Sequence, residues 1–171
     1  MNTIIKEIVY LQNIKKDYGK DKVITEALRG VSLKLIEGDF TVMMGPSGSG
    51  KSTLLNIIGG LDRATSGEIR INGQDINALS NKALSILRRN HIGFVFQNYN
   101  LIPVLTAYEN AEYVLMLQGV NPLKRREKVM SLLEEIGLGG LENRFPRELS
   151  GGQQQRVAIA RAVASEPQLV L

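Results

Sequence analysis

The sequence predicts an α/β fold with a parallel-sheet core, an antiparallel β portion at the start of the chain and an inserted helical subdomain. Three observations predict it. Short, partly alternating apolar segments come first; a continuous apolar run, Phe40–Met44, then leads into a glycine-rich turn and a helical pattern; and a long, mainly helical stretch begins near Leu101.

The antiparallel portion is expected from short segments that alternate in hydrophobicity. Glu7–Asn13 and Val31–Ile36 have strand length and strand composition. Glu68–Ile71 alternates and runs into Asn72–Gly73, a dipeptide typical of a two-residue hairpin turn. The beginning of the chain is therefore predicted to be rich in β-structure.

The parallel core is expected from apolar runs that do not alternate. Phe40–Met44 is predicted as a central strand buried on both faces, and the segment from Lys51 to Ile58 as the helix that follows it. Ile92–Phe96 and Leu169–Leu171 are predicted as further strands. Because the sequence ends inside the last of these, we expect residues 1–171 to be a single but incomplete domain, truncated in that strand.

The helical subdomain is expected over about residues 101–150, where helical patterns are interrupted by glycine and proline. A helix is also predicted from about Ser80 to Arg89. Another begins near Gly152 and stops before Pro167.

Composition excludes several kinds of site. The 171 residues include no cysteine and a single histidine, His91, which excludes thiolate chemistry and a histidine-rich metal cluster. The net charge of +4 is too weakly patterned to predict a nucleic-acid partner. Its densest run, Lys124–Arg126, precedes Glu127, so a solvated helix face is favoured over a docking patch. No apolar run approaches the roughly 20 residues that a membrane span needs.

A phosphate-binding loop is predicted between the apolar run and the helix after it. The pattern G-x-x-x-x-G-K-[ST], with one further residue, comprises Gly45, Pro46, Ser47, Gly48, Ser49, Gly50, Lys51, Ser52 and Thr53. Glycines let backbone amides approach phosphate oxygens, Lys51 can reach the β and γ phosphates, and the Ser52 hydroxyl can ligate Mg²⁺. ATP or GTP with Mg²⁺ is the expected ligand, and the alternative is a tight turn without one.

A second anion site is predicted where the chain reads Leu-Ser-Gly-Gly-Gln. Its polar members, Ser150, Gly151, Gly152 and Gln153, open a predicted helix. One polypeptide does not need two phosphate sites for one triphosphate, so the second is expected to serve a nucleotide held by another copy. The alternative is a glycine turn with a helix N-cap.

The two motifs together resemble the ATP-binding cassette (ABC) family of P-loop NTPases, whose signature is LSGGQ and whose loop often reads GPSGSGKST, as residues 45–53 do. The resemblance covers the whole chain. It implies that Tyr18 stacks on adenine, with Tyr10 or a plain core role for the tyrosine as alternatives. It also implies that Gln97 touches Mg²⁺ or the attacking water. Ser150–Gln153 would contact, in trans, the γ-phosphate bound to a second subunit of a head-to-tail dimer.

Within that family, Ile92–Gln97, Asn100–Pro103 and Gln153–Arg156 resemble the lipoprotein-releasing and macrolide-exporter branch. The branch implies an ATP-hydrolysing subunit that powers export by docking on a membrane permease, peripherally on the inner face of the cell membrane. The groove for the permease would be formed by the helical subdomain and the residues just past Gln97. The alternatives are a soluble ABC ATPase outside transport and a non-catalytic nucleotide-binding fragment.

The chain departs from the family pattern at its end. After Leu171 the family would continue with the Walker B aspartate, a glutamate that polarises water and later a switch histidine, which His91 does not match. Lys51 and Gln97 are therefore the catalytic residues we expect among residues 1–171. The chain as given is expected to bind nucleotide without turnover.

Overall fold

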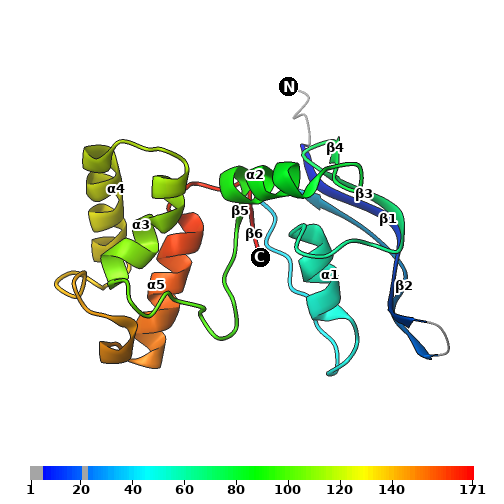
Figure 1. Cartoon of the computed structure of the whole chain (residues 1–171), viewed down its shortest axis with the longest axis horizontal. Coiled ribbons are helices and arrows are strands. Elements are labelled where there is room, and N and C mark those ends of the chain that lie inside the picture. Colours follow the sequence, from blue (N-terminus) through cyan, green and yellow to red (C-terminus); the bar gives the residue numbers. More distant parts are fainter. Residues whose placement is uncertain (1–5, 21–22) are drawn as a thin grey trace. The chain divides into compact units, whose positions relative to one another are not determined.

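The computed structural model in Figure 1 describes residues 6–20 and 23–171, which form two compact units, Met1–Ser85 and Ile86–Leu171. The strands are β1 (Glu7–Lys20), β2 (Val23–Ile36), β3 (Ser66–Ile71), β4 (Gln74–Asp75), β5 (Ile92–Gly93) and β6 (Leu169–Val170). The helices are α1 (Lys51–Ile58), α2 (Asn81–His91), α3 (Ala107–Leu117), α4 (Pro122–Glu135), the 3₁₀ turn η1 (Pro146–Glu148) and α5 (Gly151–Val163). Among the described residues, no helix has the length and apolar character to cross a membrane.

The first unit contains a four-stranded antiparallel sheet in the order β2-β1-β3-β4. The predicted β-rich beginning is confirmed, and the three segments predicted there prove to be parts of the longer strands β1, β2 and β3. Val9, Leu11 and Ile69 are buried, as alternation along strands with one covered face requires. Asn72 and Gly73 have φ of 49° and 75°, the left-handed pair that a type I′ hairpin turn needs.

The predicted central strand at Phe40–Met44 is wrong for this structure. The segment has no regular secondary structure and belongs to neither sheet, and Phe40, Val42 and Met44 are 93%, 64% and 87% exposed. A parallel strand is stable only when neighbouring strands accept its backbone hydrogen bonds. Strands β5 and β6 pair only with each other, so Phe40–Met44 has no partner strand among the described residues.

The second unit contains the parallel pair β5–β6. Both strands were predicted, although β5 ends at Gly93 and not at Phe96 as expected. The amide of Val95 still donates to Leu171 O at 2.8 Å. Gly93 lies so close to α5 that a Cβ there would be 2.3 Å from Ala162 O. Only glycine therefore allows this strand to approach the end of the helix.

Helices α3, α4 and α5 enclose the core of the second unit, which includes Ala111, Leu115, Val129, Leu133 and Val157. The first turn of α3 is completely hydrogen-bonded. Thr106 Oγ1 accepts from the amide of Glu109, while the amides of Ala107 and Tyr108 donate to Arg144 O and Glu142 O at 2.8 and 2.9 Å. The donors that usually remain free at a helix start are thus satisfied within the protein.

Asn110 is a fully buried polar side chain on α3. Its Oδ1 accepts from the amide of Ile102 at 2.8 Å, and its Nδ2 donates to the carbonyls of Ile102, Leu105 and Thr106 at 2.9 to 3.1 Å. The side chain therefore holds the segment 102–106 against the helix.

Candidate functional site

The predicted phosphate loop is an exposed turn that enters α1 at Gly50. Gly50 has φ of 88°, and a Cβ there would lie 2.6 Å from Ala27 O, so the loop closes against β2 only with glycine at this position. Lys51 begins the helix, and Ser52 and Thr53 follow in its first turn. The loop and its helix are formed as predicted.

Lys51 points its amine back over the loop. Its Nζ donates to Gly45 O at 2.8 Å and Pro46 O at 2.7 Å, and lies 3.3 Å from Ser49 Oγ. The contacts are exposed carbonyl and hydroxyl oxygens, and no carboxylate among the described residues neutralises the charge. The loop therefore presents a positive charge that an anion can bind.

The start of α1 reinforces that charge. No side chain caps the helix, so the amides of Lys51 and Ser52 have no acceptor in the described part of the chain. At α3, by contrast, the protein itself occupies the first amides. Free amides at the positive end of a helix, next to a lysine, favour an anion.

The donors around the loop suit Mg²⁺ only in combination with phosphate. The Ser52 side chain is exposed at the first turn of α1 and offers one hydroxyl oxygen. The described residues contain no group of three or more His, Cys, Asp or Glu side chains able to hold a metal. Mg²⁺ characteristically takes one or two protein oxygens and completes its shell with phosphates and water, which fits this donor set.

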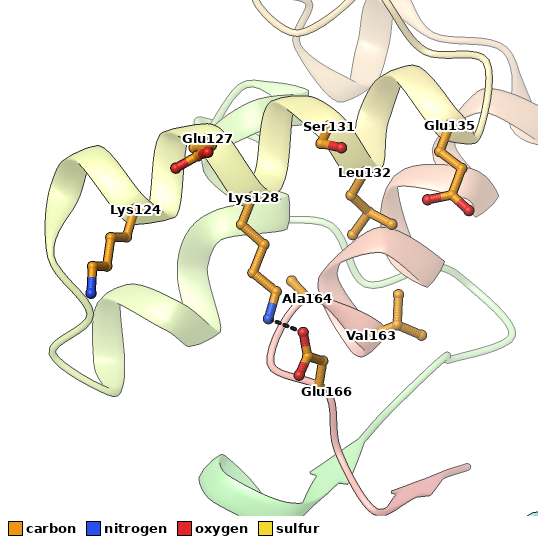
Figure 2. A pocket seen from close by; sticks show the side chains of 9 residues that line it. All are labelled: Lys124, Glu127, Lys128, Ser131, Leu132, Glu135, Val163, Ala164 and Glu166. Atoms are coloured by element: carbon orange, nitrogen blue, oxygen red, sulfur yellow. Dashed lines mark hydrogen bonds and ion pairs between the residues drawn. The ribbon is translucent and has the colours of Figure 1, made fainter.

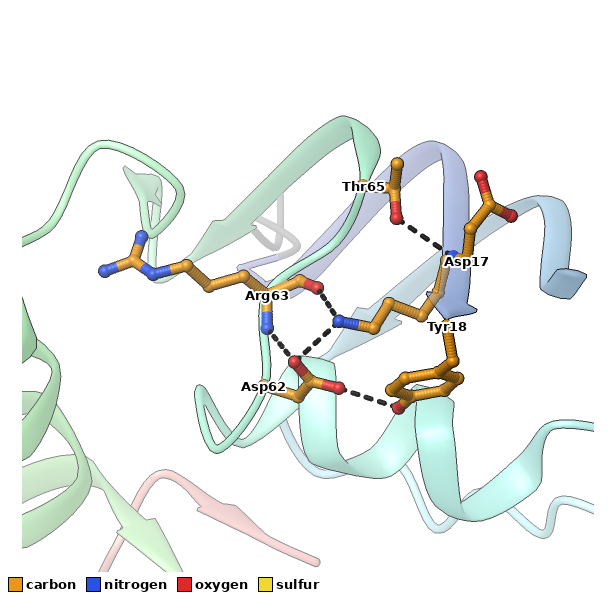
Figure 3. A network of polar contacts seen from close by, with 6 residues as sticks. Asp17, Tyr18, Asp62, Arg63 and Thr65 are labelled. Atoms are coloured by element: carbon orange, nitrogen blue, oxygen red, sulfur yellow. Dashed lines mark hydrogen bonds and ion pairs between the residues drawn. The ribbon is translucent and has the colours of Figure 1, made fainter. Parts of the chain in front are cut away.

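Tyr18 is held in a polar network of the first unit (Figure 3). Its hydroxyl donates to Asp62 Oδ2 at 2.7 Å, and Lys16 Nζ lies 4.7 Å from the ring centre and 2.7 Å from Asp62 Oδ1. The hydrogen bond to Asp62 raises the pKa of Tyr18, and the Thr53 hydroxyl opposes that shift. The hydroxyl is thus fixed, while Tyr18 as a whole is 42% exposed and accessible to a ligand.

The alternative tyrosine, Tyr10, has a different environment. Lys34 and Arg70 lie 5.0 and 5.8 Å from its ring centre, and its hydroxyl donates to Gln12 at 2.6 Å. Thr53, a residue of the predicted phosphate loop, acts on the hydroxyl of Tyr18, and its hydrogen bond lowers the pKa of that group. This favours Tyr18 as the aromatic residue beside a nucleotide.

Asp62 organises this network and was not among the residues predicted from the sequence. Burial opposes its ionisation, but hydrogen bonds from Lys16, Tyr18 and the Arg63 amide hold its pKa below the usual value. A depressed pKa means that the ionised side chain stabilises the fold above the unfolded pKa, about 3.9, and that this contribution is lost as pH falls through the folded pKa.

We therefore expect Asp62→Asn to lower the free energy of unfolding by about 1 kcal/mol at pH 7, since the pair is partly exposed. Urea unfolding of both proteins from pH 7 to pH 2.5 measures this. The two stability curves should converge as the pH falls through the folded pKa of Asp62, which lies below the unfolded value. A difference that stays constant over this range would contradict the role given to the Asp62 carboxylate.

Gln97 lies in the second unit, in an exposed turn after β5. Its side chain has no hydrogen-bond partner among the described residues, so the amide is available to a ligand. The turn continues into Tyr99 and Asn100, which both have left-handed backbone conformations.

The predicted signature residues form the N-terminus of α5. Ser150 Oγ accepts from the amide of Gln153 at 3.3 Å, and Gln153 Oε1 accepts from the amide of Ser150 at 2.8 Å. This reciprocal capping box leaves the amides of Gly151 and Gly152 without an acceptor in the described chain. The Ser150 hydroxyl still has its proton to donate, so the site combines free donors with a preformed shape.

Two hollows of about 450 Å³ lie in the second unit. The hollow in Figure 2 separates α4 from the end of α5, is crossed by the Lys128–Glu166 ion pair at 2.6 Å, and is lined by none of the predicted site residues. The other hollow is lined by Pro103, Val104, Phe145 and Arg147. Two of its lining residues, Pro103 and Val104, follow Gln97 closely in the sequence.

Comparison with known proteins decides the family. The model of the family described as "ABC transporter" matches residues 28–171. The chain belongs to the ABC transporter family. The chain is similar to the ATP-binding cassette MJ0796 of Methanocaldococcus jannaschii, whose structure was solved as a dimer in a post-hydrolysis state bound to ADP and Pi. The two structures align with a TM-score of 0.89 at 47% sequence identity, and the alignment covers 95% of this chain and 72% of the MJ0796 chain.

Named relatives point to two kinds of ABC transporter. The lipoprotein-releasing system ATP-binding protein LolD of Anaeromyxobacter dehalogenans is 49% identical over 95% of this chain and 69% of its own length. The macrolide export ATP-binding/permease protein MacB of Marinobacter nauticus is 46% identical over 96% of this chain, which spans 26% of MacB. The predicted family, its branch and the fold class are confirmed. The chain is the ATP-binding part of an ABC transporter, as the motifs predicted.

Proposed function

We propose that this chain binds MgATP and, within its full-length protein, hydrolyses it to drive export through a membrane permease. The observation that carries the proposal is the charge at the phosphate loop. Lys51 projects its amine over exposed carbonyls beside the uncapped start of α1. Such a loop binds the phosphates of a nucleotide.

The individual roles follow from the chemistry of the side chains. Gly45–Thr53 would surround the phosphates, Tyr18 would stack on adenine, and Ser52 and Gln97 would hold Mg²⁺, whose charge offsets that of the phosphates. Lys51 orients the triphosphate through a charge-assisted contact, and the Gln97 amide is free to position a water molecule. These assignments are supported by the absence of a carboxylate partner for Lys51 among the described ion pairs, by the exposed Ser52 and Gln97, and by the partly exposed Tyr18.

The signature residues would act on a nucleotide held by a second copy of the chain. Ser150–Gln153 offer two free glycine amides and a hydroxyl proton at a helix start. A dimer of this kind is supported by the similar MJ0796 cassette, whose post-hydrolysis structure is dimeric and bound to ADP and Pi.

Gly152→Asp tests this arrangement in trans. A Cβ on Gly152 meets no atom within 4 Å, so the variant should fold, while its carboxylate repels a phosphate at α5. We expect the full-length variant to bind MgATP within about 2-fold of wild type, yet to lose ATP-dependent dimerisation. Calorimetry and light scattering measure the two properties. If the monomeric variant instead lost its affinity for MgATP, the result would show that the signature acts in cis.

The permease partner is proposed from the hollow that Pro103, Val104, Phe145 and Arg147 line. Val104 is 76% exposed, and Arg147 lies 6.0 Å from the ring centre of Phe145. Such a surface suits a short amphipathic permease helix. The names of the LolD and MacB relatives support export as the direction of transport, and docking would place the chain on the cytoplasmic side of the membrane.

Residues 1–171 alone are proposed to bind nucleotide without turnover, because hydrolysis in the family uses carboxylates that follow this segment. We expect phosphate release by a 171-residue protein to remain at background. A calorimetric titration of the same protein with MgATP should still show binding. The full-length protein, assayed in parallel, supplies the positive control. Turnover by the short chain would assign the catalytic base to a residue within it.

A further inference from the structure

The segment that follows Gln97 is strained and needs support. Tyr99 and Asn100 have φ of 60° and 46°, two consecutive left-handed residues of which neither is glycine. Such conformations persist only where surrounding structure holds them. The local backbone bonds, from Tyr99 N to Phe96 O at 2.9 Å and from Asn100 N to Asn98 O at 2.6 Å, turn the chain without attaching it to a helix.

Arg161 on α5 attaches the turn. Its Nη2 donates to Tyr99 O at 2.7 Å and its Nη1 to Asn100 O at 2.6 Å, so a single guanidinium binds both strained residues. The rigid fork of arginine matches two adjacent carbonyls. Burial lowers the pKa of Arg161, and none of the ion pairs among the described residues includes it. The half-buried charge is thus committed to these two carbonyls.

The same turn contacts the other end of α5. A Cβ on Gly151 would lie 3.5 Å from the Tyr99 hydroxyl, so this side chain lies beside the first glycine of the signature. Arg161 holds the backbone of the turn from the last part of the helix, and Tyr99 reaches its first residue. Tyr99 therefore contacts α5 at two places, through its carbonyl at Arg161 and through its hydroxyl beside Gly151.

We propose that Arg161 is a positioning residue that fixes the Gln97–Asn100 turn on α5, so that Gln97 and the signature move as one body. The proposal rests on the function proposed above for Gln97. Without the guanidinium, the turn loses its attachment to the helix, and the backbone that carries Gln97 loses its fixed position. Nucleotide binding at the phosphate loop does not depend on this contact.

A spin label tests the attachment without nucleotide. Asn98 is exposed in the turn, and residues 1–171 contain no cysteine, so Asn98→Cys adds a single labelling position within them. In the full-length protein, freed of any other cysteine, the nitroxide should be immobilised. Arg161→Ala should make it mobile, and Arg161→Lys should give an intermediate spectrum because one ammonium cannot replace the fork. Lys124→Ala, which removes an exposed charge from α4, is the matched control and should leave the spectrum unchanged.

Steady-state hydrolysis by the full-length protein tests the consequence. We expect Arg161→Ala to lower kcat about 10- to 100-fold through misplacement of Gln97, with KM and the Kd for MgATP within about 2-fold of wild type. If that variant does not fold, Arg161→Lys, which retains the charge, carries both measurements. An immobile label in the variant, or an unchanged kcat, would overturn the proposal. Failure of the wild-type protein to bind MgATP would instead overturn the proposed function and leave the label result intact.

Discussion

Lys51→Ala should bind MgATP about 10- to 100-fold more weakly than the parent protein. The substitution removes the one cation at the phosphate loop whose amine is held by exposed carbonyls, those of Gly45 and Pro46. A charge-assisted hydrogen bond contributes about 1.5 to 3 kcal/mol, which corresponds to this change in affinity. Isothermal titration with MgATP measures it directly.

The control for this experiment is Lys82→Ala, which removes an exposed lysine from α2 in the same unit. It should leave the affinity for MgATP unchanged. Both variants should also keep the parent's unfolding free energy within about 0.5 kcal/mol, because both side chains lie outside the core. An unchanged affinity in Lys51→Ala would remove the main support for nucleotide binding at this loop.

Asn110→Ala should destabilise the protein by about 3 to 5 kcal/mol. At this fully buried position the substitution leaves the Ile102 amide and the Leu105 carbonyl without a partner, whereas the carbonyls of Ile102 and Thr106 keep their backbone donors. Each unsatisfied buried group costs about 1 to 3 kcal/mol, and partial relaxation limits the sum. Since whole domains are stable by only about 5 to 15 kcal/mol, chemical denaturation should show a large shift of the midpoint.

Two further variants interpret that result. Asn98→Ala removes an exposed asparagine of the same unit and should change stability by less than about 0.5 kcal/mol. Asn110→Asp retains the acceptor for the Ile102 amide but places carboxylate oxygen against three carbonyls, so it should be at least as damaging as alanine. A mild effect of either Asn110 variant would mean that water replaces the side chain.

The parts of the site that the sequence predicts are those built from neighbours in the chain. The glycine loop before Lys51 and the capping box of Ser150 with Gln153 are local devices, whose residue types are required by backbone geometry within a few positions. The structure forms both where they were expected.

Other features could not be predicted from the sequence because they join segments that are far apart in the chain. Tyr18 and Asp62 are 44 residues apart, and Arg161 and Tyr99 are 62 apart, so no periodicity connects them. The error at Phe40–Met44 has a related cause. An apolar run shows that a segment can be a buried strand, but only the remaining chain decides whether neighbouring strands accept its hydrogen bonds.

The closed first turn of α3 bears on the order in which the second unit can fold during synthesis. The acceptors for Ala107 and Tyr108 belong to Arg144 and Glu142, which leave the ribosome only after the whole of α4. Until then the amides of Ala107 and Tyr108 must bond to water, and only the local capping box of Thr106 and Glu109 fixes the start of α3. The two amides thus exchange water for protein carbonyls only when the chain behind the helix has turned back.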